Sequence, residues 1–178
     1  MLLQLGSNCS AVNLDGDTPL HKACLHGSKD IARILLTAGA HVSPRSQLQS
    51  TPLHYAASRG HWELLKFLLQ NDVSTADMNE QTSSGNTILH IAAECGQEAL
   101  VDHLLTDLYF PGDAINDMGD SALHIAAAKG HGKIIYHLLE SGVDAKKRNS
   151  RGQTARAIAE LKGQWECAAR LRARERAG

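Results

Sequence analysis

The chain has 178 residues, 43% of them hydrophobic, which is enough for a buried core, and its net charge at pH 7 is only −1. Aromatic residues make up 4% of the chain, so the core must consist mainly of closely packed aliphatic side chains. No apolar stretch approaches the length of a membrane span, and the first residues lack the basic lead and the length of a signal peptide. We therefore expect an intracellular protein, in the cytoplasm, the nucleus or both.

The small net charge hides a division along the chain. Residues 1–145 carry 8 Lys and Arg against 16 Asp and Glu, whereas residues 146–178 carry 10 against 3. The sequence thus predicts an acidic main part and a basic C-terminal end. The four cysteines are far apart in the sequence, so no zinc or redox motif is visible. Cys24 and Cys167 stand at apolar helix positions, and we expect reduced, buried thiols there.

Residues 1–15 form an incomplete unit. The interval from Gly6 to Gly16 equals that from Gly142 to Gly152, and Leu2-Leu3 aligns with Leu138-Leu139. The chain is therefore predicted to begin inside the second helix of a repeat whose first helix is missing. The first unit is either naturally truncated or the sequence is an excerpt from a longer protein. We favour the excerpt, because a terminal repeat normally has a polar outer face.

Five similar segments follow, and they start at Thr18, Thr51, Thr87, Ser121 and Thr154. Their spacings of 33, 36, 34 and 33 residues predict a repeat architecture. The clearest segment is residues 51–69. It begins with a good helix N-cap and a proline, continues with Leu-His-Tyr-Ala-Ala, and reaches a second amphipathic run after Gly60. Each unit is thus a helix, a glycine stop and a second helix.

The connections between units differ in length and composition. Those at residues 72–85 and 108–119 are longer than the pattern, which makes them candidates for specific contacts, although variable loops are also tolerated without a role. Most connections contain a glycine that indicates a tight hairpin turn. Gln49 stands at that place in one connection, so we expect a less regular turn there.

The last unit turns polar where the others are apolar. Arg156 replaces the leucine of the first helix, Ala157 replaces the histidine, and Arg170 and Arg172 replace apolar residues of the second helix. A terminal repeat needs such changes because its outer face meets water. The pattern predicts a C-terminal capping unit.

These residues resemble the ankyrin repeat family over essentially the whole chain, through Thr-Pro-Leu-His-x-Ala, Gly-His-x-Glu-Leu-Leu-x-x-Leu-Leu and a turn glycine at a period of about 33 residues. The resemblance implies an all-α repeat solenoid of stacked antiparallel helix pairs with β-hairpin fingers, curved around a concave groove. It implies one domain over 1–178, with units at 1–15 (partial), 16–48, 49–84, 85–118, 119–151 and 152–178 (the C-terminal cap).

Ten histidines raise the question of catalysis or metal binding. Four share one repeat position, where the resemblance implies a structural bond between neighbouring units: His21, His54, His90 and His124. His61 and His131 follow the helix-ending glycine and are expected to be structural as well, and His103 and His137 share a partly buried slot of the second helix. No triad spacing, metal-ligand spacing or nucleotide-binding motif is present. We predict no enzymatic activity, no cofactor and no metal site in this chain.

Two tryptophans share one repeat slot near the start of the second helix, at Trp62 and Trp165. Each could be a lid packed over the helix turn, which we favour, or a contact on the convex side.

By the same resemblance, a partner would contact the fingertips and the residues before each first-helix glycine. Several of these are apolar at positions that the repeat need not bury, which is typical of an interface centre, although single exposed apolar side chains are also common. The candidate partner-binding residues are Leu14, Asp15, Asp17, Leu25, His26, Leu48, Tyr55, Ser58, Arg59, Glu94, Cys95, Asp117, Met118, Asp120, Lys129 and Arg151.

The sequence therefore predicts a monomeric, non-catalytic module that binds a partner protein or peptide through an acidic, partly apolar groove, with no small-molecule substrate. One alternative is that the chain is the targeting or regulatory domain of a larger enzyme. Another, less favoured, is that the arginines of residues 170–176 touch nucleic acid or an anionic membrane. Arginines on a capping helix more often form a solvated end, and no aromatic residue interleaves with these.

Overall fold

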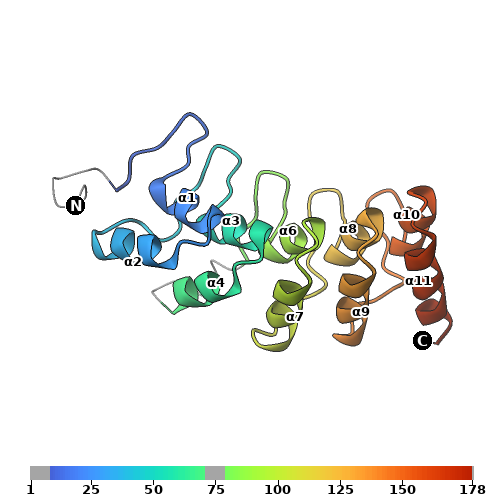
Figure 1. Ribbon diagram of the computed structural model, residues 1–178. Helices are drawn as coiled ribbons and strands as arrows, with labels where there is room; N and C mark the ends of the chain where they lie inside the picture. Colours follow the sequence, from blue (N-terminus) through green and yellow to red (C-terminus); the bar gives the residue numbers. More distant parts are fainter. Residues whose placement is uncertain (1–8, 71–78, 178) are drawn as a thin grey trace.

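The computed structural model describes residues 9–70 and 79–177, which form a row of antiparallel helix pairs (Figure 1). The pairs are α1 (Pro19–Leu25) with α2 (Lys29–Thr37), α3 (Pro52–Arg59) with α4 (Trp62–Leu69), α6 (Ile88–Glu94) with α7 (Glu98–Thr106), α8 (Ala122–Lys129) with α9 (Gly132–Glu140), and α10 (Ala155–Leu161) with α11 (Trp165–Ala177).

Each helix pair packs on the next pair in the chain. The first helices stack in the order α1, α3, α6, α8 and α10, and among the second helices α2 packs on α4, and α9 packs on α7 and α11. The first and last described residues consequently lie at opposite ends of the row (Figure 1). The predicted all-α repeat solenoid is confirmed.

The first helices start and stop as the sequence predicts. The N-cap residue of each, such as Thr51, has an extended backbone, and Pro52 occupies the first turn of α3. Gly60 ends α3 in the left-handed conformation, with φ 72°, which a side chain would disfavour. The short helices are thus bounded by their own sequence.

The core is a continuous layer of leucine, isoleucine and alanine side chains between the two rows of helices. Each central first helix contributes one fully buried leucine and two buried alanines, as Leu89, Ala92 and Ala93 do in α6. Since alanine has a small side chain, adjacent first helices approach closely. Each second helix adds larger side chains, such as Leu100 and Leu104 of α7.

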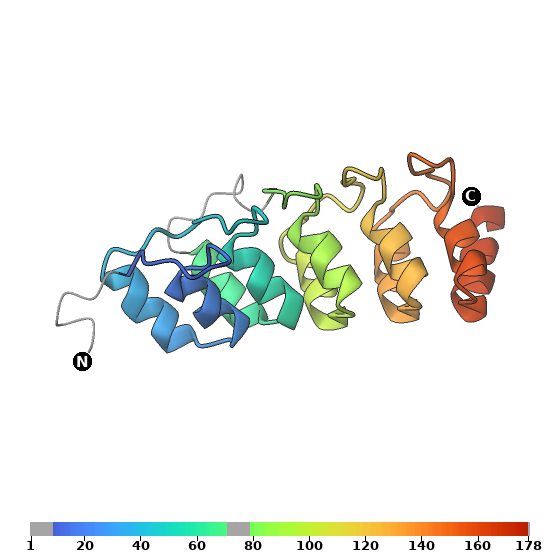
Figure 2. The ribbon, with the colours of Figure 1, turned by 90° about the horizontal axis from the view of Figure 1, so that it is seen from above.

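The connections between units form fingers that project from one side of the row (Figure 2). Within a finger the turn is closed by backbone bonds, such as that from the Asn116 N–H to the Asp120 carbonyl at 3.0 Å. Neighbouring fingertips are joined by further backbone bonds, such as Ser150 N–H to the Met118 carbonyl at 3.1 Å. The residues that the structure describes contain two isolated bridges but no strand, so the expected β-hairpins are reduced to hydrogen-bonded turns.

The turn at Gln49 is regular, so the expectation of an irregular turn is wrong. Gln49 adopts a left-handed backbone with φ 57°, as glycine does in the other fingers. The turn closes through bonds from Ser46 N–H to the Ser50 carbonyl and from Gln49 N–H to the Ser46 carbonyl, both at 2.9 Å. The Ser46 hydroxyl also accepts a bond from Ser50 N–H at 3.2 Å. These bonds hold a non-glycine residue in the left-handed conformation.

Two of the irregular segments can be compared with their predictions only in part. The helix end predicted in residues 1–8 and most of the long connection, residues 71–78, lie outside the described residues. In the other long connection, Phe110 is buried and its N–H donates to the Leu104 carbonyl at 2.9 Å, while Tyr109 is exposed. Phe110 therefore anchors this loop to the core.

Candidate functional site

The recurring histidines bridge neighbouring units, as predicted. The Nδ1 atom of His54 accepts a bond from the Thr51 backbone N–H at 3.2 Å, at the start of its own helix. Since Nδ1 accepts, the proton lies on Nε2, which donates to the Asn86 carbonyl of the next finger at 3.2 Å. His21, His90 and His124 make the same pair of contacts. Each imidazole is therefore a structural link between two units.

These contacts suit only the neutral imidazole. Burial lowers the pKa of His54 to about 4, and the positive charge of Arg45 acts in the same direction. Burial also lowers the pKa values of His21, His90 and His124. Both ring nitrogens of each histidine are bonded within the protein, which leaves none for a metal ion, and the lowered pKa values do not suit proton transfer near pH 7.

The histidines after the helix-ending glycines link each unit to the one before it. His61 Nε2 lies 3.3 Å from the Leu25 carbonyl, and His131 Nε2 lies 3.3 Å from the Glu94 carbonyl. Gln97 occupies the same slot and donates to the Ser58 carbonyl at 3.0 Å. The predicted structural role of His61 and His131 is confirmed.

Asp17 was predicted as an exposed groove residue, and this is wrong. Its side chain is 4% exposed, it accepts a hydrogen bond from the Tyr55 hydroxyl of the next unit, and it pairs with Lys22 at 2.7 Å. Burial acts to raise the Asp17 pKa, but the bonds from Lys22 and Tyr55 outweigh burial and lower the pKa. Asp17 and the half-buried Tyr55 thus join two units, and the Asp17 carboxylate is not free for a partner.

Asp120 also differs from the prediction of a free acidic residue. It is half-buried, and its carboxylate accepts a bond from the Asn149 amide of the next finger at 2.7 Å. Asn116 makes the equivalent bond to Asn86 at 2.9 Å. Two of the four predicted groove aspartates, Asp17 and Asp120, are therefore engaged between units, and the charge of Asp17 is balanced by Lys22.

The remaining candidate residues lie on the surface formed by the fingers and the first helices, which we call the finger groove. Leu14 is 93% exposed, Leu48 69% and Met118 47%, all at fingertips. The other residues that keep exposed side chains are Asp15, His26, Arg59, Glu94, Cys95, Asp117, Lys129 and Arg151, while Leu25 and Ser58 are half-buried.

The structure adds an apolar stripe that the sequence reasoning missed. Ile91 of α6 and Ile125 of α8 are half-buried at the repeat position of Tyr55, and Leu161 at the end of α10 is 72% exposed. The signal was the alignment itself, since each isoleucine follows the recurring histidine directly. Together with Tyr55 they place apolar surface along the middle of the finger groove.

An open cavity of about 330 Å³ lies at the C-terminal end of this stripe. Its walls come from three fingers and three first helices, α6, α8 and α10, and include Ile125, Ile158 and Leu161. Charged side chains of both signs stand around it, namely Glu94, Asp120, Lys129, Arg151 and Lys162. The cavity therefore combines an apolar surface with convergent polar groups, as binding sites do.

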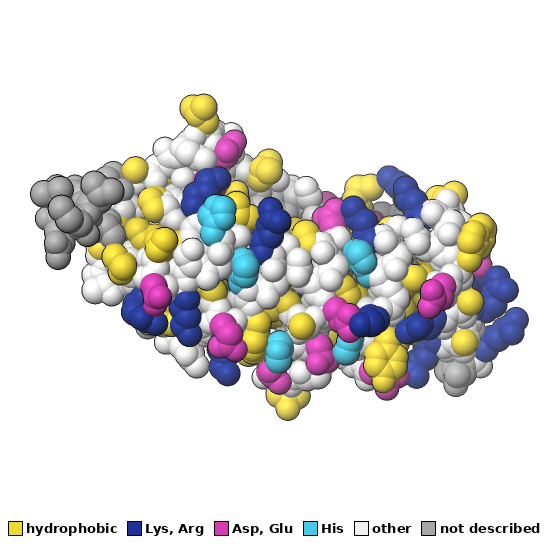
Figure 3. Space-filling model, in the orientation of Figure 1, with side chains coloured by type: hydrophobic (Ala, Val, Ile, Leu, Met, Phe, Trp, Pro, Cys, Tyr) yellow, Lys and Arg dark blue, Asp and Glu magenta, His cyan; other side chains and the backbone are white. Residues whose placement is uncertain are grey.

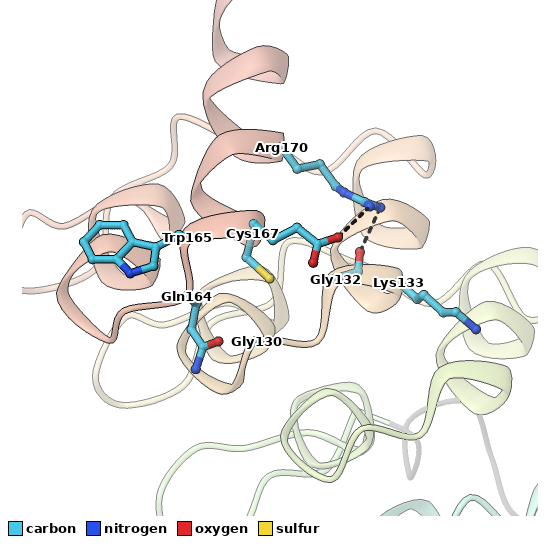
Figure 4. Close-up of a pocket in the computed structure, with 8 residues that line it drawn as sticks. Gly130, Gly132, Lys133, Gln164, Trp165, Cys167 and Arg170 are labelled. Atoms are coloured by element: carbon cyan, nitrogen blue, oxygen red, sulfur yellow. Dashed lines mark hydrogen bonds and ion pairs between the residues drawn. The ribbon is translucent and has the colours of Figure 1, made fainter.

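A second cavity, of about 410 Å³, lies on the other side of the last two units, between the starts of α9 and α11 (Figure 4). Its Arg170 donates to the Gly132 carbonyl at 3.2 Å and lies 3.8 Å from Glu166. The Trp165 ring, which is 69% exposed, points away from Arg170 and Cys167 (Figure 4). This cavity has no set of converging groups that would define a ligand.

The two tryptophans differ in their surroundings. Trp62 is half-buried and stacks on His103 of the next unit, with ring centroids 4.5 Å apart, as expected of a packed lid. His103 and His137 are half-buried, as predicted, and His137 lies 3.0 Å from Asp102. Trp165 belongs to the last unit and stays exposed. The lid interpretation is confirmed for Trp62 only.

Positive side chains gather at the C-terminal end of the row (Figure 3). Arg172 pairs with Glu160 at 3.0 Å, and Arg174 donates to the Leu139 carbonyl at 3.0 Å. Because Arg170 is also bonded within the protein, three of the four arginines of α11 have internal partners. This arrangement favours the solvated-end interpretation of α11 over an anionic partner.

The cysteines are free, and Cys24 and Cys167 are buried, as predicted. Burial raises the pKa of Cys24 to about 12, so this thiol is unreactive near pH 7. Among residues 9–70 and 79–177, no three His, Cys, Asp or Glu side chains are grouped in a way that could hold a metal ion. In that same part of the chain, every helix is too short or too polar to cross a membrane.

A family model that describes ankyrin repeats in three copies matches residues 1–81, 38–112 and 73–149. The chain belongs to the ankyrin repeat family. Ankyrin repeats are protein-interaction modules that are generally non-catalytic, and the predicted resemblance is confirmed.

Similar curated proteins are much longer than this chain. It is 36% identical over 125 residues to a probable E3 ubiquitin-protein ligase, XBOS33, from Oryza sativa subsp. japonica, which covers 68% of this chain and 23% of the relative. It is 30% identical over 153 residues to the E3 ubiquitin-protein ligase XBAT33 from Arabidopsis thaliana, covering 85% and 28%. It is 31% identical over 139 residues to human neurogenic locus notch homolog protein 1, covering 78% and 5%. The chain thus spans less than a third of each of these relatives.

Proposed function

We propose that this ankyrin repeat chain is a non-catalytic module that binds a partner protein through the finger groove. The observation that carries the proposal is the apolar stripe of Tyr55, Ile91 and Ile125, which runs beside exposed fingertips. Half-buried apolar surface surrounded by polar residues is typical of the centre of a protein interface. The stripe lies on a rigid stack, so a partner would bind without reordering the chain.

The candidate residues that remain accessible define the edges of this surface. Leu48 and Met118 lie on the finger side, and Arg59 lies at the end of α3 on the helix side. Arg59 is exposed, and no acidic side chain among residues 9–70 and 79–177 lies within ion-pair distance of it. A partner with a complementary charge would gain more from Arg59 than from a residue that is already paired.

Site-specific photo-cross-linking in cells tests this placement. A photoreactive amino acid is introduced at Arg59 or Met118 in the finger groove, and at Tyr136, which is 51% exposed on the second helix α9, as the matched control. We expect covalent adducts with a partner protein from the two groove positions and none from Tyr136. Adducts from Tyr136 alone would place the binding surface on the opposite side and refute the proposal.

A second candidate function is that the groove recruits a target for a larger enzyme. Two of the similar proteins are named E3 ubiquitin-protein ligases, and this chain covers only 23% and 28% of them. We therefore propose recruitment as the alternative role of the same surface. Determining the full transcript tests it, since the recruiting role requires a catalytic domain in the same protein.

A further inference from the structure

We infer that the 330 Å³ cavity at the C-terminal end of the finger groove binds an acidic segment of the partner protein, in which an apolar side chain stands next to aspartate or glutamate. This inference rests on the proposed function, because it assigns a chemistry to one part of the groove. It reverses the sign of charge that the sequence predicted for the groove.

The floor of the cavity suits an apolar side chain. Ile125 and Ala128 of α8 and Ile158 and Leu161 of α10 contribute to its lining. Leu161 is 72% exposed, so it offers apolar surface to a ligand. A volume of 330 Å³ lies at the lower end of the range of about 300–1,000 Å³ for ligand pockets. One large side chain with its neighbouring backbone therefore fits better than a drug-sized molecule.

The two carboxylates of the cavity are already engaged. Glu94 pairs with Lys129 at 3.1 Å, and Asp120 accepts a bond from the Asn149 amide at 2.7 Å. Each carboxylate therefore has a partner that a ligand would have to displace.

The other two cations of the cavity are not engaged. Within residues 9–70 and 79–177, neither the Arg151 guanidinium nor the Lys162 amine has a side-chain hydrogen bond or an ion pair. Both residues are exposed, Arg151 at the last fingertip and Lys162 after α10, so they lie on the finger side and the helix side of the cavity. The charge that the cavity offers to a ligand is consequently positive.

Charge complementarity therefore selects a carboxylate-bearing segment. A carboxylate beside the apolar side chain would gain bonds from Arg151 or Lys162 without breaking an existing pair. A nucleic acid is less suited, because its sugars and closely spaced phosphates would lie against the apolar lining of the cavity. An acidic, partly apolar peptide would match both the apolar lining of the cavity and the cations of Arg151 and Lys162.

A displayed library of random peptides, selected on the whole chain, provides the test. We expect the enriched peptides to share an aspartate or glutamate next to leucine, isoleucine, methionine or phenylalanine. Their affinity, measured by titration, should fall about tenfold or more in the double variant R151E/K162E. The control K66E/K146E changes the net charge equally at exposed residues outside this cavity and should keep the wild-type affinity within about twofold.

Replacing the acidic residue of the selected peptide by its amide should weaken binding to the wild type and cause no further loss in R151E/K162E. The inference is overturned if no peptide is enriched, if the enriched peptides lack acidic residues, or if R151E/K162E binds them as tightly as the wild type does. Non-acidic peptides that no longer bind the Leu161→Asp variant would refute the charge preference and leave the finger groove as the binding surface. The photo-cross-linking experiment decides the proposed function independently, because it does not depend on peptide chemistry.

Discussion

Replacing His54 by glutamine tests whether the buried histidines make the stability of the stack depend on pH. The folded protein holds His54 as a neutral imidazole, because Nδ1 already accepts a backbone N–H bond and Nε2 donates to the Asn86 carbonyl. A proton on Nδ1 would face another N–H group in a buried site. Protonation is therefore expected to favour the unfolded chain.

The size of the effect follows from the change in pKa. The ordinary pKa of 6.5 falls to about 4 in the folded protein, mainly through burial. The stability that the neutral imidazole maintains is thus present in full above pH 6.5 and is lost as the pH falls toward 4. One pKa unit corresponds to about 1.4 kcal/mol, so His54 alone should cost about 2 kcal/mol by about pH 5 and about 3 kcal/mol once the pH is below 4.

Urea unfolding of the wild type and of His54→Gln, each at about pH 7.5 and about pH 5, measures this loss. The free energy of unfolding of the wild type should fall by about 2 kcal/mol more between the two pH values than that of the variant. His26→Gln, which removes an exposed imidazole, is the matched control. An equal fall in the wild type and in His54→Gln would show that His54 does not couple folding to protonation.

Three further substitutions test the turns and the links between units. Gly119→Ala should lower the melting temperature more than Gly152→Ala does, by the equivalent of about 1 kcal/mol. Both glycines have φ 72°, but a Cβ at Gly119 would lie 2.6 Å from a backbone nitrogen of the next finger, whereas a Cβ at Gly152 would have nothing within 4 Å. Equal losses would contradict this contact. Gln49→Gly should raise the free energy of unfolding in urea by roughly 0.5–1 kcal/mol, since glycine has no penalty at φ 57°, and a decrease would show that the glutamine is not strained. Tyr55→Phe removes a hydrogen bond to a buried carboxylate, so it should lower the free energy of unfolding by about 1 kcal/mol and raise the pKa of Asp17. An NMR titration measures that pKa, and an unchanged value would contradict the bond.

The solenoid could be predicted from the sequence because its determinants are local and recurrent. Each N-cap residue, such as Thr51, and each stop, such as Gly60, acts on its own helix, and the period repeats the signal along the chain. The role of the four buried histidines followed from the family resemblance and from their shared position. Features whose residues all lie within one repeat unit can therefore be predicted from the sequence alone.

The finger groove was predicted less well because its character depends on contacts between units. Asp17 and Tyr55 are 38 positions apart, and only the stacking geometry brings their side chains together. The same holds for Asp120 and Asn149, 29 positions apart. A sequence shows that an aspartate is present but not which side chain of the next unit bonds to it, so more free aspartates were predicted in the groove than the structure supports.

The conformation of Gln49 shows a different limit. A glycine in a finger predicts a left-handed turn, but its absence does not exclude one. The bonds of Ser46 hold Gln49 at φ 57°, and these bonds depend on the geometry of the finger rather than on the residue type at the turn. The neighbouring hydrogen bonds offset the free-energy cost of a left-handed backbone at a non-glycine residue.

The histidine bridges also determine how the row would respond to force. Each bridge joins residues that are 29 to 32 positions apart, whatever its place in the chain. Adding units would lengthen the protein without lengthening its contacts, so folding need not become slower as the row grows. When the two ends are pulled apart, helix pairs should detach one after another, each held mainly by its neighbour. The stack would then behave as an extensible tether with a graded response.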